Sequence, residues 1–320
     1  MVYEEFLETI VEHFQMEFGE EYQITLRRIP KNNGITLDSL CINRSDFPMS
    51  PAIYLNAYYD QLQAGMSLDA IIHDIRKLYY GTSIPTAIRQ IDLSDFQTQK
   101  TRIMFKLIHT ASNEELLEEI PHISYLDLSI VFYLHLDRSA AGQMTALIRN
   151  EHMKRWNVRT KDLWRYALLN TPMNFPAEIR SMDDMIKEVA SQTLGSRYDE
   201  KALTELLEED QQISPLYVLT NPMGLNGACC MLYRNVLKDF AYAIGEDLII
   251  LPSSIHEVLI TPNHPGTSYE DLSRLVTTVN KNEVPPEDQL SNQVYLYTRV
   301  DDRIRIVSHG PERVGAAAGH

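Results

Sequence analysis

Residues 236–260 read VLKDFAYAIGEDLIILPSSIHEVLI, and this stretch decides the fold class. Its first part places apolar residues at helical spacing, and Gly245 follows them as a stop signal. Leu248–Leu251 is a short apolar run of strand length, and Glu257–Ile260 is a second one. A link this short joins antiparallel strands more readily than parallel ones, because a parallel pair needs a long crossover. The stretch therefore predicts a helix packed on an antiparallel sheet.

The rest of the chain mixes helices and strands in the same way, without a strict alternation. Turn residues Lys31–Gly34 separate two strand-like segments and predict a hairpin. The patterns Ser112-x-x-Glu115 and Ser268-x-x-Asp271 predict helix starts with capping boxes. Further helices are expected at 3–18 and 68–81, and further strands at 126–136, 143–149, 216–219, 228–232, 294–299 and 304–307. We expect an α+β fold of two lobes, in which mixed, mostly antiparallel sheets pack with amphipathic helices.

The domain boundary is expected near residue 193. The stretch 193–213 is polar and acidic and contains Gly195 and the run Glu208–Asp210. This predicts an N-terminal α+β lobe at 1–192 and a C-terminal α+β lobe at 193–312. Residues 313–320 are small and polar, and we expect a mobile tail there.

The charge balance limits the classes of partner. The chain carries 29 Lys and Arg against 44 Asp and Glu, a formal net charge of −15 in 320 residues. An acidic protein repels phosphate groups, so nonspecific binding to nucleic acid or to an anionic membrane is not expected. A hydrophobic fraction of 44% excludes a disordered chain.

The N-terminus and the cysteines indicate a compartment. MVYEEFLETIVEHF has acidic residues where an export signal needs basic ones, and the apolar runs are too short to span a membrane. Three cysteines, Cys41, Cys229 and Cys230, two of them adjacent, are interpreted as reduced thiols. We expect a cytoplasmic protein without a cofactor.

The segment Leu251–Val258 (LPSSIHEV) resembles an uncharacterised family, a numbered domain of unknown function from low-GC Gram-positive gut bacteria. Residues 148–156 (IRNEHMKRW) and 163–171 (LWRYALLNT) resemble it too, as do the pairs 279–280, 290–291 and 294–295. The resemblance covers residues 3 to 308. It implies a bacterial, cytoplasmic protein and brings no activity, cofactor or catalytic residue with it.

The first candidate site is hydrolytic. Pro252–Glu257 holds two hydroxyls, an imidazole and a carboxylate, and His264 follows. Acyl-transfer chemistry needs a hydroxyl beside an imidazole that a carboxylate orients, so Ser254, His256, Glu257 and His264 form the candidate catalytic set. In an extended segment Glu257 points away from His256, and no glycine forms a nucleophile elbow. The alternative is that the serines satisfy backbone groups and His256 packs against a helix.

A metal site is not expected at these residues. The spacing H-E-x6-H differs from the H-E-x-x-H pattern that puts two ligands one helical turn apart.

The second candidate site is a basic segment that contains both tryptophans. Residues 149–165 hold six basic and two acidic residues within an acidic chain. Such a contrast beside two indoles suits an acidic protein partner. The alternative is a helix pair packed on a sheet, whose solvated face carries the charges. The candidate partner-binding residues are Arg149, Lys154, Arg155, Trp156, Arg159 and Trp164.

These observations favour a non-enzymatic protein-binding or accessory protein. One alternative is a hydrolase centred on the Pro-Ser-Ser-Ile-His-Glu segment, and another is the structural subunit of a homo-oligomer. Membrane binding is not expected, and binding of nucleic acid is disfavoured.

Overall fold

The chain folds as two compact units. The computed structural model describes residues 1–44, 52–81, 95–139, 142–194 and 215–308. Unit 1 comprises Met1–Gln99 and Leu134–Ala146, and unit 2 comprises Lys100–Tyr133 and Leu147–His320. The boundary predicted near residue 193 adjoins residues 195–214, which lie outside the described residues, as does the predicted tail.

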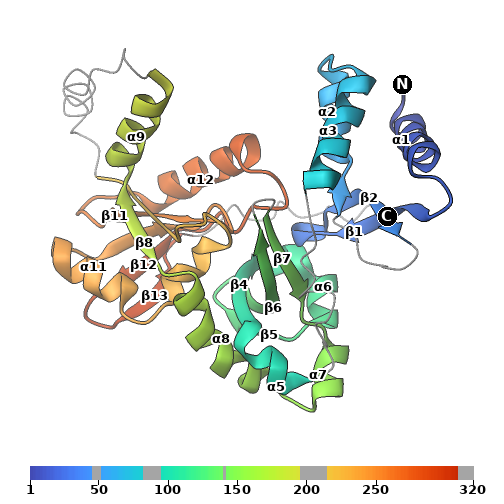
Figure 1. Cartoon of the computed structure of the whole chain (residues 1–320). Helices are drawn as coiled ribbons and strands as arrows, with labels where there is room; N and C mark the ends of the chain where they lie inside the picture. The colour runs from blue at the N-terminus through green and yellow to red at the C-terminus, as the bar shows by residue number, and fades with distance from the viewer. Residues whose placement is uncertain (45–51, 82–94, 140–141, 195–214, 309–320) are drawn as a thin grey trace, which may run out of the picture. The chain divides into compact units, whose positions relative to one another are not determined.

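In unit 1, helices pack on a small antiparallel sheet (Figure 1). Its main elements are α1 (Tyr3–Phe18), β1 (Tyr22–Pro30), β2 (Thr36–Arg44), β3 (Ile53–Tyr54), α2 (Asn56–Gln63), α3 (Leu68–Gly81) and α5 (Phe96–Gln99). β1 and β2 pair from Tyr22 opposite Arg44 to Pro30 opposite Thr36, which confirms the predicted hairpin. Asn33 and Gly34 in its turn have φ values of 60° and 70°, the left-handed region that these residue types favour.

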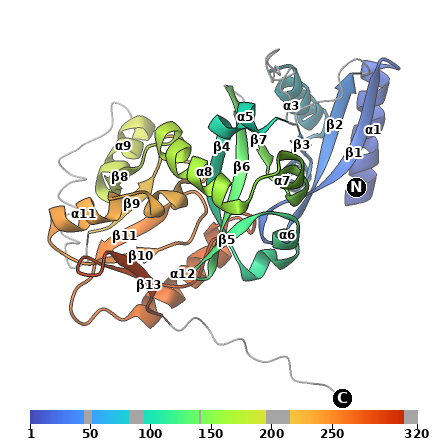
Figure 2. The ribbon, with the colours of Figure 1, turned by 90° about the horizontal axis from the view of Figure 1, so that it is seen from below.

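The core of unit 1 lies between α1, α3 and the sheet. Figure 2 shows α1 alongside β1 and β2. Phe6, Ile10 and Phe14 are fully buried at the expected i, i+4 spacing. They meet the apolar residues Ile24, Leu40, Ile42, Ile53, Leu55, Ile71, Ile72 and Ile75.

Unit 2 contains a sheet in the order β4-β6-β5, with β7 paired to β6. Its strands and neighbouring helices are β4 (Ile103–His109), α6 (Glu114–Glu119), β5 (His122–Tyr125), β6 (Leu128–Ser139), β7 (Gly142–Leu147), α7 (Asn150–Trp156) and α8 (Thr160–Asn174). The end of β6 and most of β7 group with unit 1. α8 lies along β4 in Figures 1 and 2.

The second sheet of unit 2 has the order β13-β12-β10-β11-β9-β8. Its elements and neighbouring helices are β8 (Glu178–Ser181), α9 (Met182–Leu194), β9 (Tyr217–Thr220), η5 (Gly227–Leu232), α11 (Val236–Ile244), β10 (Leu248–Leu251), β11 (Val258–Pro262), α12 (Tyr269–Glu283), β12 (Tyr295–Thr298) and β13 (Arg303–Ile306). Ile249 and Leu251 pack with Val276 of α12. Leu248 and Ile250 are also fully buried and point to the opposite face, so both faces of β10 are covered.

Two local predictions were wrong. Residues 228–232 form the 3₁₀ segment η5 and not a strand, because Gly227–Met231 are buried on all sides and such a run has no diagnostic period. Ser112 does not cap α6: its hydroxyl lies 2.8 Å from Nδ1 of His109, and α6 starts after Asn113.

The described strands pair antiparallel wherever their register is defined, which confirms the α+β class. The three cysteines are free and buried, as expected. Among the described helices, none combines the length and the apolar character needed to cross a membrane.

Candidate functional site

The hydroxyl of Ser254 is used to shape its own loop. Ser254 follows β10, is only 4% exposed, and forms an isolated bridge with Gln289. Its Oγ atom accepts a hydrogen bond from the backbone N–H of His256 at 3.0 Å. The structure therefore brings Ser254 and His256 together through the backbone, as the alternative sequence interpretation of the serines expected.

The ring of His256 has a partner at each nitrogen. Nδ1 accepts from the backbone N–H of Asn226 at 3.2 Å, and Nε2 lies 3.2 Å from Oδ1 of Asp288. Because a backbone N–H can only donate, Nδ1 carries the lone pair and the proton of the neutral ring sits on Nε2. Asp288 thus orients the imidazole, but the nitrogen that would take a proton from a nucleophile is already an acceptor.

Close backbone contacts hold three loops together around His256. The hydroxyl of Thr220 donates to the carbonyl of His256 at 2.8 Å, and Ile255 N–H donates to the carbonyl of Asp288 at 2.8 Å. A Cβ atom at Gly227 would lie 2.2 Å from Oγ1 of Thr220 and 2.4 Å from the carbonyl oxygen of His256. Only glycine fits there, which explains one of the glycines in the Asn221–Gly227 turn.

Glu257 and His264 are not part of this arrangement. The carboxylate of Glu257, at the start of β11, makes no hydrogen bond or ion pair among the described residues. His264 is exposed beyond the other end of β11, and a five-residue strand spans about 17 Å. The described residues contain no group of three or more His, Cys, Asp or Glu side chains that could hold a metal ion.

The basic segment 149–165 forms α7, the turn at Asn157 and the start of α8. The guanidinium of Arg149 forms an ion pair with Glu119, and Asn150 donates to the carbonyl of Glu118 at 2.9 Å. The backbone N–H of Arg149 donates to Nδ1 of His152 at 3.0 Å. Arg149 therefore ties α7 to α6.

The remaining cations of the segment face solvent. Their side chains are exposed and have no ion-pair partner among the described residues. We call this set the cationic surface: Lys154, Arg155, Arg159, Lys161 and Arg165.

Both tryptophans turn inward. Trp156 is 7% exposed and stacks on His152, with ring centroids 5.7 Å apart. Burial lowers the pKa of His152 below its ordinary value, so the ring is neutral beside the indole. Trp164 packs edge-on against Phe105 at 5.1 Å. A partner would reach the cationic surface without touching Trp156.

Polar anchors fix α8 on β4. The hydroxyl of Thr171 accepts from the backbone N–H of Phe105 at 3.1 Å. The amide of Asn170 donates to the carbonyls of Lys100 and Ile103 at 2.8 and 3.0 Å. These contacts and the burial of Leu163 account for much of the stretch LWRYALLNT.

The sequence interpretation missed the apolar continuation of the cationic surface. Lys161, Arg165, Leu169 and Met173 follow one another at i, i+4 spacing along α8, and the last two are 64% and 82% exposed. The spacing was visible in the sequence, but only the anchors of α8 show which face of the helix turns outward.

Comparison with known proteins adds a family. The model of a family of unknown function (DUF5688) matches residues 3–299. No curated protein and no solved structure matches the chain. The chain belongs to the DUF5688 family of unknown function.

Proposed function

We propose that the chain is a non-enzymatic binding protein whose cationic surface docks an acidic segment of a partner protein. The observation that carries this proposal is the set of five exposed cations on α7, on α8 and at Arg159 just before α8, which have no ion-pair partner among the described residues, in a chain of net charge −15. We also propose that the protein is bacterial and acts in the cytoplasm.

Charge contrast supports an acidic partner. Elsewhere several described cations are already paired, for example Arg76 with Glu17 and Arg180 with Glu188. Lys154, Arg155 and Arg159 have no such neighbour, so a carboxylate-rich segment meets them without displacing an existing ion pair.

The exposed apolar residues that continue the cationic surface along α8 indicate what else the partner segment carries besides carboxylates. Leu169 and Met173 extend the stripe of Lys161 and Arg165 along one face of α8. An acidic amphipathic segment, with carboxylates at one end and apolar residues at the other, matches this order. Because Asn170 and Thr171 hold α8 in place, the surface is preformed.

The test compares reversal of charge at two places in the full chain. The first variant carries Lys154→Glu, Arg155→Glu and Arg159→Glu. The control carries Arg27→Glu, Lys77→Glu and Lys281→Glu, which are also exposed and unpaired among the described residues. Both variants change the net charge equally.

The probe is a fluorescent synthetic helical peptide that carries Glu residues at i, i+4 spacing in one half and Leu residues at the same spacing in the other half, and its binding is read by fluorescence anisotropy. We expect the first variant to weaken binding at least about tenfold and to flatten its salt dependence, whereas the control binds like the wild type. Leu169→Ser with Met173→Ser is expected to weaken binding without changing the salt dependence. Equal losses in both charge variants would overturn the proposal.

A second copy of this acidic chain is another source of carboxylates. Light scattering of the wild type and the first variant distinguishes it: a wild-type mass above 36.8 kDa that falls in the variant identifies the partner as the chain itself. That result would favour the homo-oligomer hypothesis over a separate partner protein.

The hydrolase hypothesis has one observation in its favour, the pairing of Asp288 with His256. For that chemistry, Nδ1 would have to exchange Asn226 for a nucleophile. Ester hydrolysis that is lost in Ser254→Ala, with unchanged folding, would support this second candidate; equal turnover of p-nitrophenyl esters by variant and wild type would exclude it.

A further inference from the structure

The chain contains two Asn-Gly pairs, Asn33–Gly34 in unit 1 and Asn226–Gly227 in unit 2. Asparagine is thermolabile, and most of all before glycine, because glycine has no Cβ to hinder attack by its backbone nitrogen on the side-chain amide. Both asparagines have left-handed backbone angles, φ 60° and ψ 33° at Asn33 and φ 53° and ψ 24° at Asn226. The sequence and the local backbone therefore do not distinguish the two pairs.

The reaction at such a pair needs only water. The backbone nitrogen of the glycine loses its proton and bonds to Cγ of the asparagine, and the Cγ–Nδ2 bond breaks with release of ammonia. The five-membered imide then takes up one water molecule and opens to an aspartyl or an isoaspartyl residue. The ring closes only after the peptide between the two residues rotates about ψ of the asparagine, away from its left-handed value. The freedom of that peptide therefore decides the rate.

The peptide between Asn226 and Gly227 is held on both sides. The N–H of Asn226 donates to Nδ1 of His256 at 3.2 Å, and the carbonyl of Asn226 accepts from the N–H of Cys229 at 3.4 Å. Gly227 is buried, and a Cβ atom there would lie 2.2 Å from Oγ1 of Thr220. Rotation of this peptide breaks both hydrogen bonds and meets close-packed neighbours.

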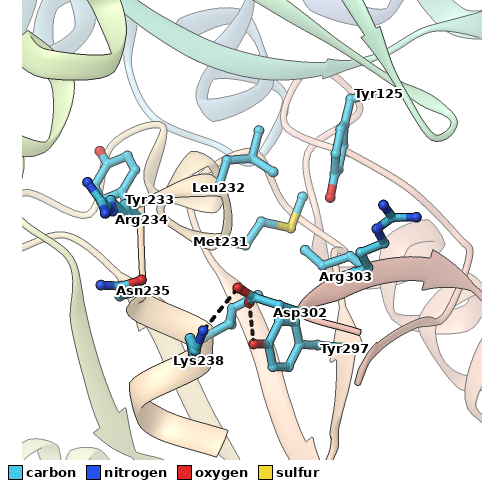
Figure 3. Close-up of a pocket in the computed structure, with 12 residues that line it drawn as sticks. Tyr125, Met231, Leu232, Tyr233, Arg234, Asn235, Lys238, Tyr297, Asp302 and Arg303 are labelled. Atoms are coloured by element: carbon cyan, nitrogen blue, oxygen red, sulfur yellow. Dashed lines mark hydrogen bonds and ion pairs between the residues drawn. The ribbon is translucent and has the colours of Figure 1, made fainter. Parts of the chain in front are cut away.

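The nearest pocket does not open this pair to water. A pocket of about 680 Å³ lies at the other end of η5, and Figure 3 shows Met231 and Leu232 in its lining. Neither Asn226 nor Gly227 is among the described residues that line it.

The peptide between Asn33 and Gly34 lies at the tip of the β1–β2 hairpin. The N–H of Lys31 donates to the carbonyl of Ile35 at 2.7 Å, and the N–H of Ile35 donates to the carbonyl of Asn32 at 3.3 Å. Gly34 is exposed, and Asn33 is half-buried. Opening of such a tip costs less free energy than opening of a buried segment, so this peptide rotates more often than the one in unit 2.

We infer that the folded chain deamidates spontaneously at Asn33 and is protected at Asn226. The isoaspartyl product adds a methylene to the main chain within the hairpin turn. Because turn geometry sets the register of a hairpin, this product weakens the pairing that ends with Pro30 opposite Thr36. The site shares no residue with the cationic surface and does not depend on the proposed docking of a partner.

The test is incubation of the full chain at mildly alkaline pH, with and without urea, followed by proteolysis and mass spectrometry that assigns each conversion to a residue. In the folded chain we expect Asn33 to convert at least about tenfold faster than Asn226, and in urea we expect the two rates to agree within about threefold. Equal rates in the folded chain, or faster conversion of Asn226, would overturn the inference. So would an Asn33 that converts only in urea.

Variants separate the causes. His256→Ala removes the acceptor for the N–H of Asn226 and is expected to speed conversion of Asn226 at least about threefold, in a chain that circular dichroism shows to be folded. Gly34→Ala is expected to slow conversion of Asn33 at least about tenfold. Its control is Gly19→Ala, which has a similar positive φ of 71° in unit 1. Unchanged conversion of Asn226 in the first variant, or equal slowing in the two glycine variants, would contradict the inference.

The effect on the hairpin is measured with aged protein. The isoaspartyl form, enriched by ion exchange, is expected to unfold at a lower urea concentration than fresh protein. Asn33→Asp carries the new charge without the added methylene and is expected to unfold like fresh protein. An aged form that unfolds like fresh protein would overturn the weakened pairing.

Discussion

The Nε2 atom of His256 lies 3.2 Å from a carboxylate oxygen of Asp288, while Nδ1 of the same ring accepts the backbone N–H of Asn226. The imidazole thereby joins the loop after β10 to two loops from distant parts of the sequence. Because both ring nitrogens make these contacts, the Ser-Ser-Ile-His-Glu segment has a structural explanation that does not require a catalytic role for His256.

Replacement of His256 is expected to destabilise unit 2. His256→Ala removes the acceptor for the backbone N–H of Asn226 and the partner of the Asp288 carboxylate. This loss is expected to lower the free energy of unfolding by about 1 to 3 kcal/mol. His256→Asn keeps an acceptor near the position of Nδ1 and is expected to lose less. Urea denaturation followed by circular dichroism measures both. Wild-type stability in His256→Ala would contradict the structural role.

Replacement of Gly227 is expected to cost more than replacement of Gly224. A Cβ at Gly227 would lie 2.4 Å from the carbonyl oxygen of His256, so Gly227→Ala must push two backbones apart, at about 3 kcal/mol or more. Gly224→Ala meets no atom within 4 Å and is strained only by its φ of +61°, at about 1 kcal/mol. The midpoints of urea denaturation give the order, and a reversed order would refute the close approach.

Asp127 is expected to matter for stability because two hydroxyls from the C-terminal part of unit 2 donate to it. Ser291 donates to Oδ2 at 2.6 Å, and the fully buried Tyr295 donates to Oδ1. Asp127→Ala leaves both donors unsatisfied and is expected to cost about 2 to 4 kcal/mol, whereas Tyr295→Phe removes one donor and costs about 1 kcal/mol. Additive losses in the double variant would argue against a shared network.

Mild acid is expected to loosen α7 through His152. Its pKa in the folded chain lies below the ordinary 6.5, chiefly because burial disfavours the imidazolium. The unfolded chain therefore binds the proton first as the pH falls through 6.5. The stability is complete above that value and declines below it, toward the lowered folded pKa.

The measurement is the urea midpoint at pH 7.5 and 5.5, read from Trp156 fluorescence in a Trp164→Phe background. Protonation also removes the acceptor for the N–H of Arg149. His152→Asn removes the titration and is expected to shrink the difference between the two pH values. An unchanged difference would assign the effect to other groups.

Regular elements with one buried face could be predicted from the sequence. The stripe of Leu7, Val11, Phe14 and Phe18 predicted α1, although the fully buried stripe is Phe6, Ile10 and Phe14. Ser268 caps α12 by accepting from the N–H of Asp271, as its pattern indicated. The segment η5 could not be identified in this way, because Gly227–Met231 are all buried and a run buried on every side has no diagnostic period.

The candidate sites were predicted only in part. The sequence pointed to Ser254 and His256 but not to Asp288 or Asn226, since no local spacing relates these loops. It also grouped Arg149 with the other cations, although Arg149 pairs with Glu119.

The sequence by itself determined the α+β class, most elements and their caps, and the acidic balance against which residues 149–165 stand out. The elements and their caps depend on neighbours within about one helical turn or one hairpin, and the charge balance follows from the composition alone. Only the tertiary structure decided which cations of residues 149–165 lack an ion-pair partner among the described residues and which nitrogen of His256 carries the proton of the neutral ring. These depend on contacts between residues far apart in the chain, and such contacts leave no period or spacing in the sequence.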